Sequence, residues 1–513
     1  MNYLSVCRQL GLLILVMSGS VLAAAGWSWV QLALGDAREV AAFRALILTV
    51  AIGGTVGASL WMGARKAAGD IGRREAILLV ASSWFIAGGI AALPYRLWSM
   101  LETGAAASAP FAGFVDCYFE AMSGLTTTGA TILPDVESLP RSMLLWRSIT
   151  HWLGGLGIVV LFVAVLPLLG VGGKHLYRVE APGPKAGGGV RPRIQETARV
   201  LWLIYVGLTL AEIVALWAAG MSLFDAVCHT FATLATGGFS TQNASVAAYD
   251  SALIDAIIVA FMLAAGINFG LYFQALRGGW RQVYRDPELR CYLGILSVAS
   301  LFVIVMVYGR TFTTTAGTQV PSDLGSAVRH GLFTVVSILT TTGFCTADFE
   351  HWSFPVHAVL LVLMYVGGCA GSTGGGLKVI RCLMVFKIIW GELEHVFRPR
   401  AVRALHVGNA VIDSDMKIST LVYVLSVVLL TAAGAGVIML LERGKMIDVT
   451  TAVSATAATL NNIGPGLNQV GASRNYAWFT DGSKCVMTVL MALGRLELFT
   501  ILVLLSPRYW KSD

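Results

Sequence analysis

The sequence predicts an all-α integral membrane protein, with two N-terminal transmembrane helices and then four pseudo-repeats of helix, re-entrant loop and helix around one axis. Three observations predict this fold class. Of the 513 residues, 56% are hydrophobic and 13% charged, whereas about a quarter are charged in soluble domains. A polar, glycine-bearing break between apolar runs occurs four times. Basic residues gather in alternate loops, as the positive-inside rule requires of a multi-spanning chain.

The four breaks define an internal repeat. They occupy residues 125–131, 236–240, 340–344 and 461–466, and alignment of their first glycines gives a period of roughly 110 residues. Those glycines are Gly129, Gly237, Gly343 and Gly464. A threonine precedes the glycine in three copies, and Ile463 does so in the fourth. An amphipathic stretch of about three turns, such as 114–124 or 224–234, comes before the break and predicts a short re-entrant helix.

The loops have the chemistry expected of an ion pore. Non-helical backbone at membrane depth is tolerated only where protein buries it or where it lines a water-filled cavity. Glycine adopts positive φ without a steric penalty, and rings of carbonyl oxygens can replace the hydration shell of an alkali cation. The C-terminal end of each short helix adds a partial negative charge of about half an electron. The predicted cation ligands are Thr127, Thr128, Gly129, Thr236, Gly237, Thr342, Gly343, Asn462, Ile463 and Gly464.

Residues 1–70 are predicted to form the N-terminal transmembrane helix pair. The apolar run at 10–34 is long enough to span a membrane. A secretory signal peptide is the alternative, because small residues near 22–25 offer a cleavage site. The run continues past that point through Trp27 and Trp29, which favours an uncleaved helix. The second span is 42–62, and a basic loop with Arg65, Lys66, Arg73 and Arg74 follows it.

The rest of the chain divides into pore repeat 1 (71–180), repeat 2 (181–285), repeat 3 with a broken second helix (286–405) and repeat 4 (406–513). The predicted spans are 77–97 and 144–169, 200–219 and 253–276, 291–308 and 356–390, and 418–441 and 486–505. Every second loop is basic, so we expect ten crossings with both termini in the cytoplasm. The four glycine loops then face the outside.

A glycine-rich stretch interrupts the second helix of repeat 3. Residues 367–376 hold too many glycines for a stable helix, because each interior glycine costs about 1 kcal/mol relative to alanine. The helix is therefore predicted to break near mid-membrane and to form a mobile constriction in the permeation path, although a packing kink between helices is the alternative. The gate candidates are Gly371, Ser372, Thr373, Gly374, Gly375, Gly376, Lys378 and Arg495.

Arg495 lies inside the last apolar run. A cationic side chain there costs about 2.5 kcal/mol or more and normally faces the bundle interior. Neutralisation by Glu497 is unfavourable, because residues two apart point away from each other on a helix. We hypothesise that Arg495 limits flux from the cytoplasmic side of the loops.

Other residue patterns exclude several site classes. The eight cysteines are scattered without metal-ligand spacing, so no disulfide framework and no structural metal is expected. The net charge of +7 comes from loops beside apolar runs, which indicates contact with membrane lipid and no nucleic-acid partner. The glycine-rich stretch 182–190 lacks the G-K-[ST] of a phosphate-binding loop. His151 and Asn268 are expected to be hydrogen-bonding partners between helices, without a site role.

The four loops (T-T-G, A-T-G, T-T-G and N-I-G-P-G), the glycine-rich break in repeat 3 and L-G-R-L-E-L-F-T near the C-terminus resemble the Trk/Ktr/HKT superfamily of cation transporters. The resemblance covers most of the chain, and the extra pair of spans before repeat 1 is similar to the TrkH branch. It implies a potassium-uptake subunit of a bacterial cytoplasmic membrane, with K⁺ as the transported ion and no organic cofactor. It also implies a gate at 367–376 that Arg495 approaches. Its implied partners are a second copy in a homodimer and a TrkA-type, nucleotide-binding regulatory subunit in the cytoplasm.

Two other functions are weighed against this one. An ion-coupled secondary transporter of a small solute would need carboxylates near mid-span, for which Glu212 and Glu497 are the candidates. A membrane-embedded enzyme would need paired carboxylates, an activated nucleophile or a metal cluster, and the sequence offers none of these constellations. Channel-like conduction and proton or sodium symport both fit the same loops.

Overall fold

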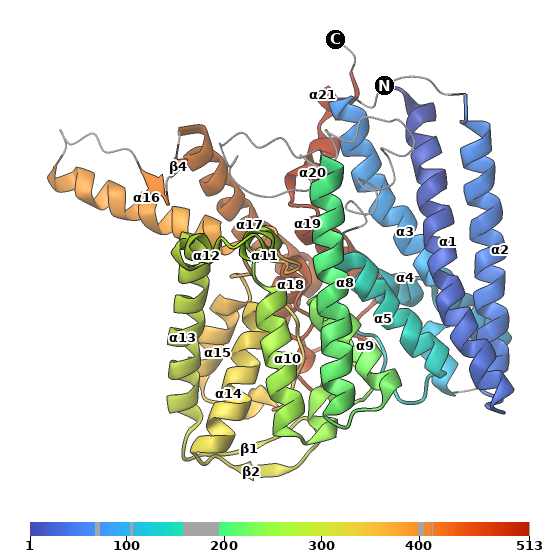
Figure 1. Cartoon of the computed structure of the whole chain (residues 1–513), viewed down its shortest axis with the longest axis horizontal. Coiled ribbons are helices and arrows are strands. Elements are labelled where there is room, and N and C mark those ends of the chain that lie inside the picture. The colour runs from blue at the N-terminus through green and yellow to red at the C-terminus, as the bar shows by residue number, and fades with distance from the viewer. Residues whose placement is uncertain are drawn as a thin grey trace.

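The computed structural model describes residues 1–66, 72–102, 106–155, 157, 194–398, 405–408, 410–412 and 414–511. Helices dominate this part of the chain (Figure 1). Most of the loop between the predicted spans 144–169 and 200–219, including the stretch 182–190, lies outside the described residues, as does the end of the span 144–169. The described residues also contain two short antiparallel hairpins: β1 (Thr311–Thr313) with β2 (Gln319–Pro321), and β3 (His406–Val407) with β4 (Ala410–Val411).

The first two helices, α1 (Tyr3–Ala33) and α2 (Glu39–Gly63), form a hairpin. α1 is one continuous helix through the region where a signal peptide would be cleaved. The helices approach closely at two glycines, because a Cβ on Gly11 would lie 2.8 Å from the carbonyl oxygen of Gly57. Small residues permit such backbone contact between membrane helices.

The four repeats follow in order. Repeat 1 contains α3 (Arg73–Leu101), α4 (Phe114–Leu125) and α5 (Arg141–Gly155). Repeat 2 contains α8 (Ile194–Ala218), α9 (Leu223–Leu234), α10 (Ala252–Ala265) and α11 (Phe269–Leu276). Repeat 3 contains α13 (Pro287–Val307), α14 (Leu324–Leu339), α15 (Phe354–Leu363) and α16 (Val379–Phe397). Repeat 4 contains α17 (Ser414–Leu441), α18 (Val449–Asn461), α19 (Asp481–Arg495) and α20 (Phe499–Leu502).

Short elements connect these helices. They are α12 (Trp280–Arg285), α21 (Pro507–Trp510) and the 3-10 turns Ala106–Phe111, Ser245–Tyr249, Phe349–His351, Asn468–Val470 and Val503–Leu505. The predicted short helices before the loops are confirmed as α4, α9, α14 and α18, which we call the pore helices.

Six described helices are long and apolar enough to cross a membrane, or eight if each bent pair counts as one span. The six are α1, α2, α3, α8, α13 and α17. The all-α membrane fold is thereby confirmed. The two remaining predicted crossings are the second spans of repeats 1 and 3. Most of the former lies outside the described residues, and the latter breaks at the glycine-rich stretch.

The second helices of repeats 2 and 4 differ from the prediction. Residues 253–276 and 486–505 were expected to be continuous spans, but α10 and α11 meet at 92° and α19 meets the α20 segment at 111°. Asn268 accepts the N–H of Gly270 and begins α11 as a new helix, while Glu497 and Leu498 have positive φ. The predicted break in repeat 3 is confirmed, because α15 ends at Leu363 and α16 begins at Val379.

A buried carboxylate fastens the N-terminal hairpin to repeat 1. Glu39 is fully buried at the start of α2 and accepts the backbone N–H of Ser142 at 3.0 Å and the hydroxyl of Ser28 at 2.8 Å. Ser142 lies in the first turn of α5, where unpaired N–H groups and the helix dipole favour a negative charge. The hairpin therefore packs on the pore repeats instead of standing apart from them.

Candidate functional site

The pore helices all end in the same way. The residue that follows the last helical turn has positive φ in every repeat, between 53° and 59°, although none of these residues is glycine. They are Thr127, Thr236, Thr341 and Asn462. Left-handed conformations are uncommon outside glycine and gather at functional sites. One residue later, the N–H donates to the carbonyl oxygen five residues earlier at 2.8–3.0 Å, in Thr128, Gly237, Thr342 and Ile463.

A glycine with φ between 79° and 93° comes next in each loop: Gly129, Gly238, Gly343 and Gly464. This corrects the predicted register of the second loop by one residue. Gly237 was aligned with the other three glycines, but it occupies the position of Thr128, Thr342 and Ile463. Loop 2 contains a Gly-Gly pair, and the end of α9 with its hydrogen bonds places the second glycine at the turn.

The four glycines close a ring between the loops. A Cβ on Gly129 would overlap the carbonyl oxygen of Gly237, one on Gly238 that of Thr342, and one on Gly343 that of Ile463. A Cβ on Gly464 would lie 2.7 Å from the carbonyl oxygen of Thr128. The loops therefore follow one another around one axis in the order of the repeats, and the last returns to the first. Side chains at these glycines would push the ring apart.

A cavity of about 400 Å³ lies on one side of this ring. All four loops line it, because Gly129, Gly238, Gly343 and Gly464 all border it. Its wall also contains Ser240, Tyr476 and Arg474. Ser240, Arg474 and Tyr476 follow the turn glycines of their repeats in the sequence. The cavity therefore lies on the side of the ring that the chain reaches after each loop.

Buried polar side chains support the loops from behind. Arg147 and Glu120 form an ion pair at 2.8 Å with almost no exposure of either side chain. Glu120 also accepts the N–H of Ile132 at 2.9 Å, and the Arg147 guanidinium lies 3.9 Å from the centre of the Phe239 ring. The pair thus connects loop 1 to loop 2. Substitution of either partner would be strongly destabilising, because it would leave an unpaired buried charge.

Other buried side chains support the loops of repeats 2 and 4. His229 contacts the hydroxyl of Ser240 at 2.9 Å, and Ser454 accepts the N–H of Leu467 at 2.9 Å. The sequence pattern did not predict these supports. Glu120 and His229 each precede the turn glycine of their own repeat by nine residues (129 − 120 and 238 − 229), which is a visible signal only once the register of loop 2 is correct.

The glycine-rich stretch of repeat 3 lies directly against the pore-helix ends. The N–H of Gly375 donates to the Thr341 hydroxyl at 2.7 Å. A Cβ on Gly375 would lie 2.6 Å from the carbonyl oxygen of Asn461. The predicted gate residues Gly371, Ser372, Thr373, Gly374, Gly375 and Gly376 all fall in the irregular segment between α15 and α16, which we call the intramembrane loop (364–378). The side chain of Lys378 is buried and donates to the carbonyl oxygen of Gly374.

Arg495 joins the intramembrane loop to repeat 1. One guanidinium nitrogen donates to the carbonyl oxygen of Thr373 at 2.8 Å, and the other donates to the carbonyl oxygen of Gly155 at 2.8 Å and to that of Gly154. Glu497 instead pairs with Arg381 of α16 at 2.7 Å. Glu497 therefore does not neutralise Arg495, in agreement with the prediction, because the two side chains have different partners.

Glu288, at the start of α13, was not identified from the sequence. Its Oε1 atom accepts the N–H of Ala370 at 2.7 Å and that of Ile380 at 3.1 Å. These two residues stand on either side of the gate candidates 371–378. A single carboxylate oxygen therefore holds both ends of that segment.

Among the described residues, neither of the two isolated polar residues forms the interhelical side-chain hydrogen bond that was expected. Asn268 caps α11, and a Cβ on Gly371 would lie 3.1 Å from its Oδ1 atom. His151 stacks on Phe239 with ring centroids 4.1 Å apart, and neither ring nitrogen has a hydrogen-bond partner among the described residues.

Glu212 is fully buried on α8. Within the described ranges, no group of three or more His, Cys, Asp or Glu residues could hold a metal ion.

Comparison with known proteins gives consistent matches. The family model described as "TrkH: Cation transport protein" matches residues 41–512. The Trk system potassium uptake protein TrkH of Escherichia coli (strain K12) is 38% identical over 522 residues and covers 100% of both chains. TrkG of the same organism is 34% identical over 465 residues, covering 89% of this chain and 90% of its own. The crystal structure of the potassium transporter TrkH from Vibrio parahaemolyticus matches with a TM-score of 0.83 at 34% identity, over 100% of both chains.

Proposed function

This chain belongs to the TrkH family of cation transport proteins, and on that premise we propose that it carries potassium ions into the cell along the axis enclosed by its four loops. The relatives named as potassium uptake proteins support the choice of ion. The closed ring of glycines and carbonyl oxygens is the observation that carries the proposal. A ring of backbone carbonyls suits a weakly hydrated alkali cation, which needs several hard oxygen ligands at once.

The proposed filter is built from successive positions of the loops. The central ring consists of the carbonyl oxygens of Thr128, Gly237, Thr342 and Ile463, which lie next to the turn glycines. Thr127, Thr236, Thr341 and Asn462 form the layer towards the pore helices, and Gly129, Gly238, Gly343 and Gly464 the layer towards the cavity. The C-terminal ends of the pore helices add partial negative charge near the same axis. Repetition of one backbone geometry in all four repeats supports this reading.

We propose that the intramembrane loop is the gate. It lies against Thr341 and Asn461, directly beside the filter, so an ion leaving the filter on that side meets it. Arg495 and Lys378 hold its carbonyl oxygens and place positive charge near the path. A cation would have to displace or pass these contacts. Movement of this loop is therefore the simplest way to open and close the path.

We propose that the protein is a homodimer that buries one face of α16. This helix projects away from the bundle (Figure 1). Five of its exposed apolar side chains recur with helical periodicity and share one face: Phe386, Ile389, Trp390, Leu393 and Val396. Trp390 is 63% exposed and Val396 82%. A second copy of the chain would cover this stripe.

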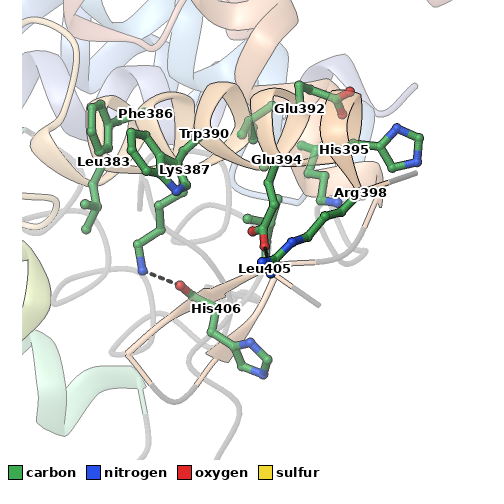
Figure 2. Close-up of a pocket in the computed structure, with 13 residues that line it drawn as sticks. Leu383, Phe386, Lys387, Trp390, Glu392, Glu394, His395, Arg398, Leu405 and His406 are labelled. Carbon is green, nitrogen blue, oxygen red and sulfur yellow. Dashed lines mark hydrogen bonds and ion pairs between the residues drawn. The ribbon is translucent and has the colours of Figure 1, made fainter. Parts of the chain in front are cut away.

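The neighbouring surface of α16 carries several polar side chains, and Phe386 and Trp390 at the edge of the stripe also border it. A cavity of about 710 Å³ separates this surface from the β3 strand, and Figure 2 shows Lys387 reaching the carbonyl oxygen of His406 across it. Glu394, His395, Arg398 and Lys417 also line this cavity. We propose that this polar surface and the basic residues around α12 form the docking face for a TrkA-type, nucleotide-binding regulatory subunit.

We place the protein in a bacterial cytoplasmic membrane with both termini in the cytoplasm. The two termini lie at the same end of the molecule (Figure 1). Arg74, at the start of α3, donates to the carbonyl oxygen of Lys511 at 2.8 Å, which fixes the C-terminal segment to that end. An even number of crossings and basic loops on this side support a cytoplasmic location.

Uptake of Rb⁺ or K⁺ into proteoliposomes tests the proposal. Saturable uptake by the purified protein, weakly inhibited by sodium and lost in Gly343→Asp, is the expected result. Uptake that ignores external potassium and requires a proton or sodium gradient with another solute would contradict it and favour a secondary transporter. Uptake that appears only after addition of the regulatory subunit would support the pathway and assign control to that partner.

A further inference from the structure

Loop 2 lacks the pair of threonine hydroxyls that lies within loops 1 and 3. In loop 1, the hydroxyls of Thr126 and Thr128 lie 2.8 Å apart, and in loop 3 those of Thr340 and Thr342 are also 2.8 Å apart. All four of these threonines are fully buried. The equivalent residues in loop 2 are Ala235 and Gly237, and neither carries a hydroxyl. The carbonyl oxygen of Gly237 nevertheless belongs to the same ring as those of Thr128 and Thr342.

A side chain from another repeat occupies the space behind Gly237. A Cβ on Gly237 would lie 2.6 Å from both Cγ and Cε1 of His151, which comes from α5 of repeat 1. The imidazole ring is fully buried and stacks on Phe239, two residues beyond Gly237, at an interplanar angle of 17°. Four residues along the same helix, a Cβ on Gly155 would lie 2.8 Å from the Cα atom of Ala235. Helix α5 therefore packs directly against Ala235 and Gly237, the two positions of loop 2 that lack a hydroxyl.

Hydrogen bonding does not explain the presence of this imidazole. Neither ring nitrogen has a partner among the described residues, and an unpaired buried polar group costs about 1–3 kcal/mol. What the ring supplies is volume and a flat contact surface. Interiors are close-packed, so an unfilled space of this size would leave Gly237 without support on that side.

We propose that His151 takes the place, in loop 2, of the threonine side chain found in loops 1 and 3, and that it thereby determines the ion selectivity of the filter. This inference rests on the proposed potassium pathway. Selectivity in a carbonyl filter depends on the spacing and number of the oxygens that an ion meets. Glycine has the least restricted backbone of all residues, so the Gly237 carbonyl needs an external support to keep its direction. His151 is a positioning residue that acts through Gly237.

The proposal is tested by removing the side chain of His151 in repeat 1 and placing a threonine at residue 237 in repeat 2. The readout is the preference for K⁺ over Na⁺ in competition with Rb⁺ uptake into proteoliposomes. His151→Ala is expected to lower this preference about tenfold, which corresponds to about 1.4 kcal/mol. His151→Phe keeps the volume and is expected to retain the wild-type preference. Gly237→Thr alone is expected to abolish uptake, because its side chain would overlap His151. The double variant H151A/G237T rebuilds a loop like those of repeats 1 and 3 and is expected to regain selective uptake.

The outcomes separate this inference from the proposed function. If the wild-type protein shows no potassium-selective uptake, with or without a regulatory subunit, the potassium pathway itself fails. If wild-type uptake is selective but a folded His151→Ala protein keeps that preference, the role of His151 is refuted. It is equally refuted if H151A/G237T is no better than Gly237→Thr, or if His151→Phe loses the preference as the alanine variant does. Thr209 is a buried residue of α8 whose hydroxyl accepts the indole N–H of Trp152. Thr209→Val serves as a control that should leave selectivity unchanged.

Discussion

The guanidinium of Arg495 lies 2.8 Å from the carbonyl oxygen of Thr373, so the last long helix of the chain is bonded directly to the intramembrane loop of repeat 3. The same side chain also reaches Gly154 and Gly155 at the end of α5. Three repeats therefore meet at one cation beside the proposed filter. A change in this contact would affect both the position of the loop and the electrostatic barrier to a passing ion.

Replacement of Arg495 by alanine should raise the initial rate of Rb⁺ uptake several-fold, because it removes both the contact and the positive charge. Arg495→Lys keeps the charge but cannot make the same set of bonds, since lysine lacks the planar fork of donors. An intermediate rate for lysine would show that the contact contributes beyond charge. If Arg495→Ala leaves rate and apparent affinity unchanged, the residue has no part in gating.

The anchor at Glu288 should control the same loop from its other side. Because both backbone N–H groups bond to one carboxylate oxygen, Glu288→Gln can preserve both contacts through its amide oxygen, whereas Glu288→Ala cannot. We expect near-wild-type uptake for glutamine and faster uptake, with less dependence on a regulatory subunit, for alanine. The selectivity for K⁺ over Na⁺ should not change, because the filter loops are untouched. Equal behaviour of the two variants would argue against an anchoring role.

The corrected register of loop 2 has a direct test. Gly238→Ala and Gly343→Ala should both abolish uptake, since each added Cβ would meet a carbonyl oxygen of the next loop. Gly309 also has positive φ, but a Cβ there would meet nothing within 4 Å. Gly309→Ala should therefore cost only the backbone strain of about 1–2 kcal/mol and should keep full uptake. Normal uptake by Gly238→Ala would show that this glycine does not belong to the ring.

The buried pair behind loops 1 and 2 should dominate local stability. Glu120→Ala leaves Arg147 buried without its counter-ion, for which we expect a loss of about 3–5 kcal/mol in the free energy of unfolding. Thermal unfolding in detergent micelles measures this loss. The exposed pair between Arg38 and Asp36 provides the control, since Asp36→Ala should cost only about 0–1 kcal/mol. Similar shifts in both variants would mean that Glu120 and Arg147 do not support the loops.

The apolar stripe of α16 should determine the oligomeric state. Leu393→Glu and Trp390→Glu place charge in the proposed interface and should convert a dimer to a monomer, as measured by light scattering of the detergent-solubilised protein. Lys387→Gln, whose side chain faces the β3 strand instead, should leave the dimer intact. A protein that stays dimeric with both glutamates in place must associate through another surface.

Composition and local pattern were enough to predict the membrane class, the fourfold repeat, the pore helices and the break in repeat 3. These features depend on long apolar runs, on glycine content and on helical periodicity, all of which are visible within a short window of sequence. The match with the TrkH crystal structure and the described helices agree with that prediction. The candidate ligands at the four loops remain a proposal, but their common backbone geometry was foreseeable from the repeated glycine.

Only the tertiary structure decided which atoms face one another. The register of loop 2 follows from how α9 ends, because either glycine of the Gly237 and Gly238 pair satisfies the sequence pattern. Glu288 meets the intramembrane loop from 82 residues away, and Arg495 does so from 122. His151 supports a loop of the next repeat. Such contacts depend on how separate helices pack together, and no local periodicity encodes that packing.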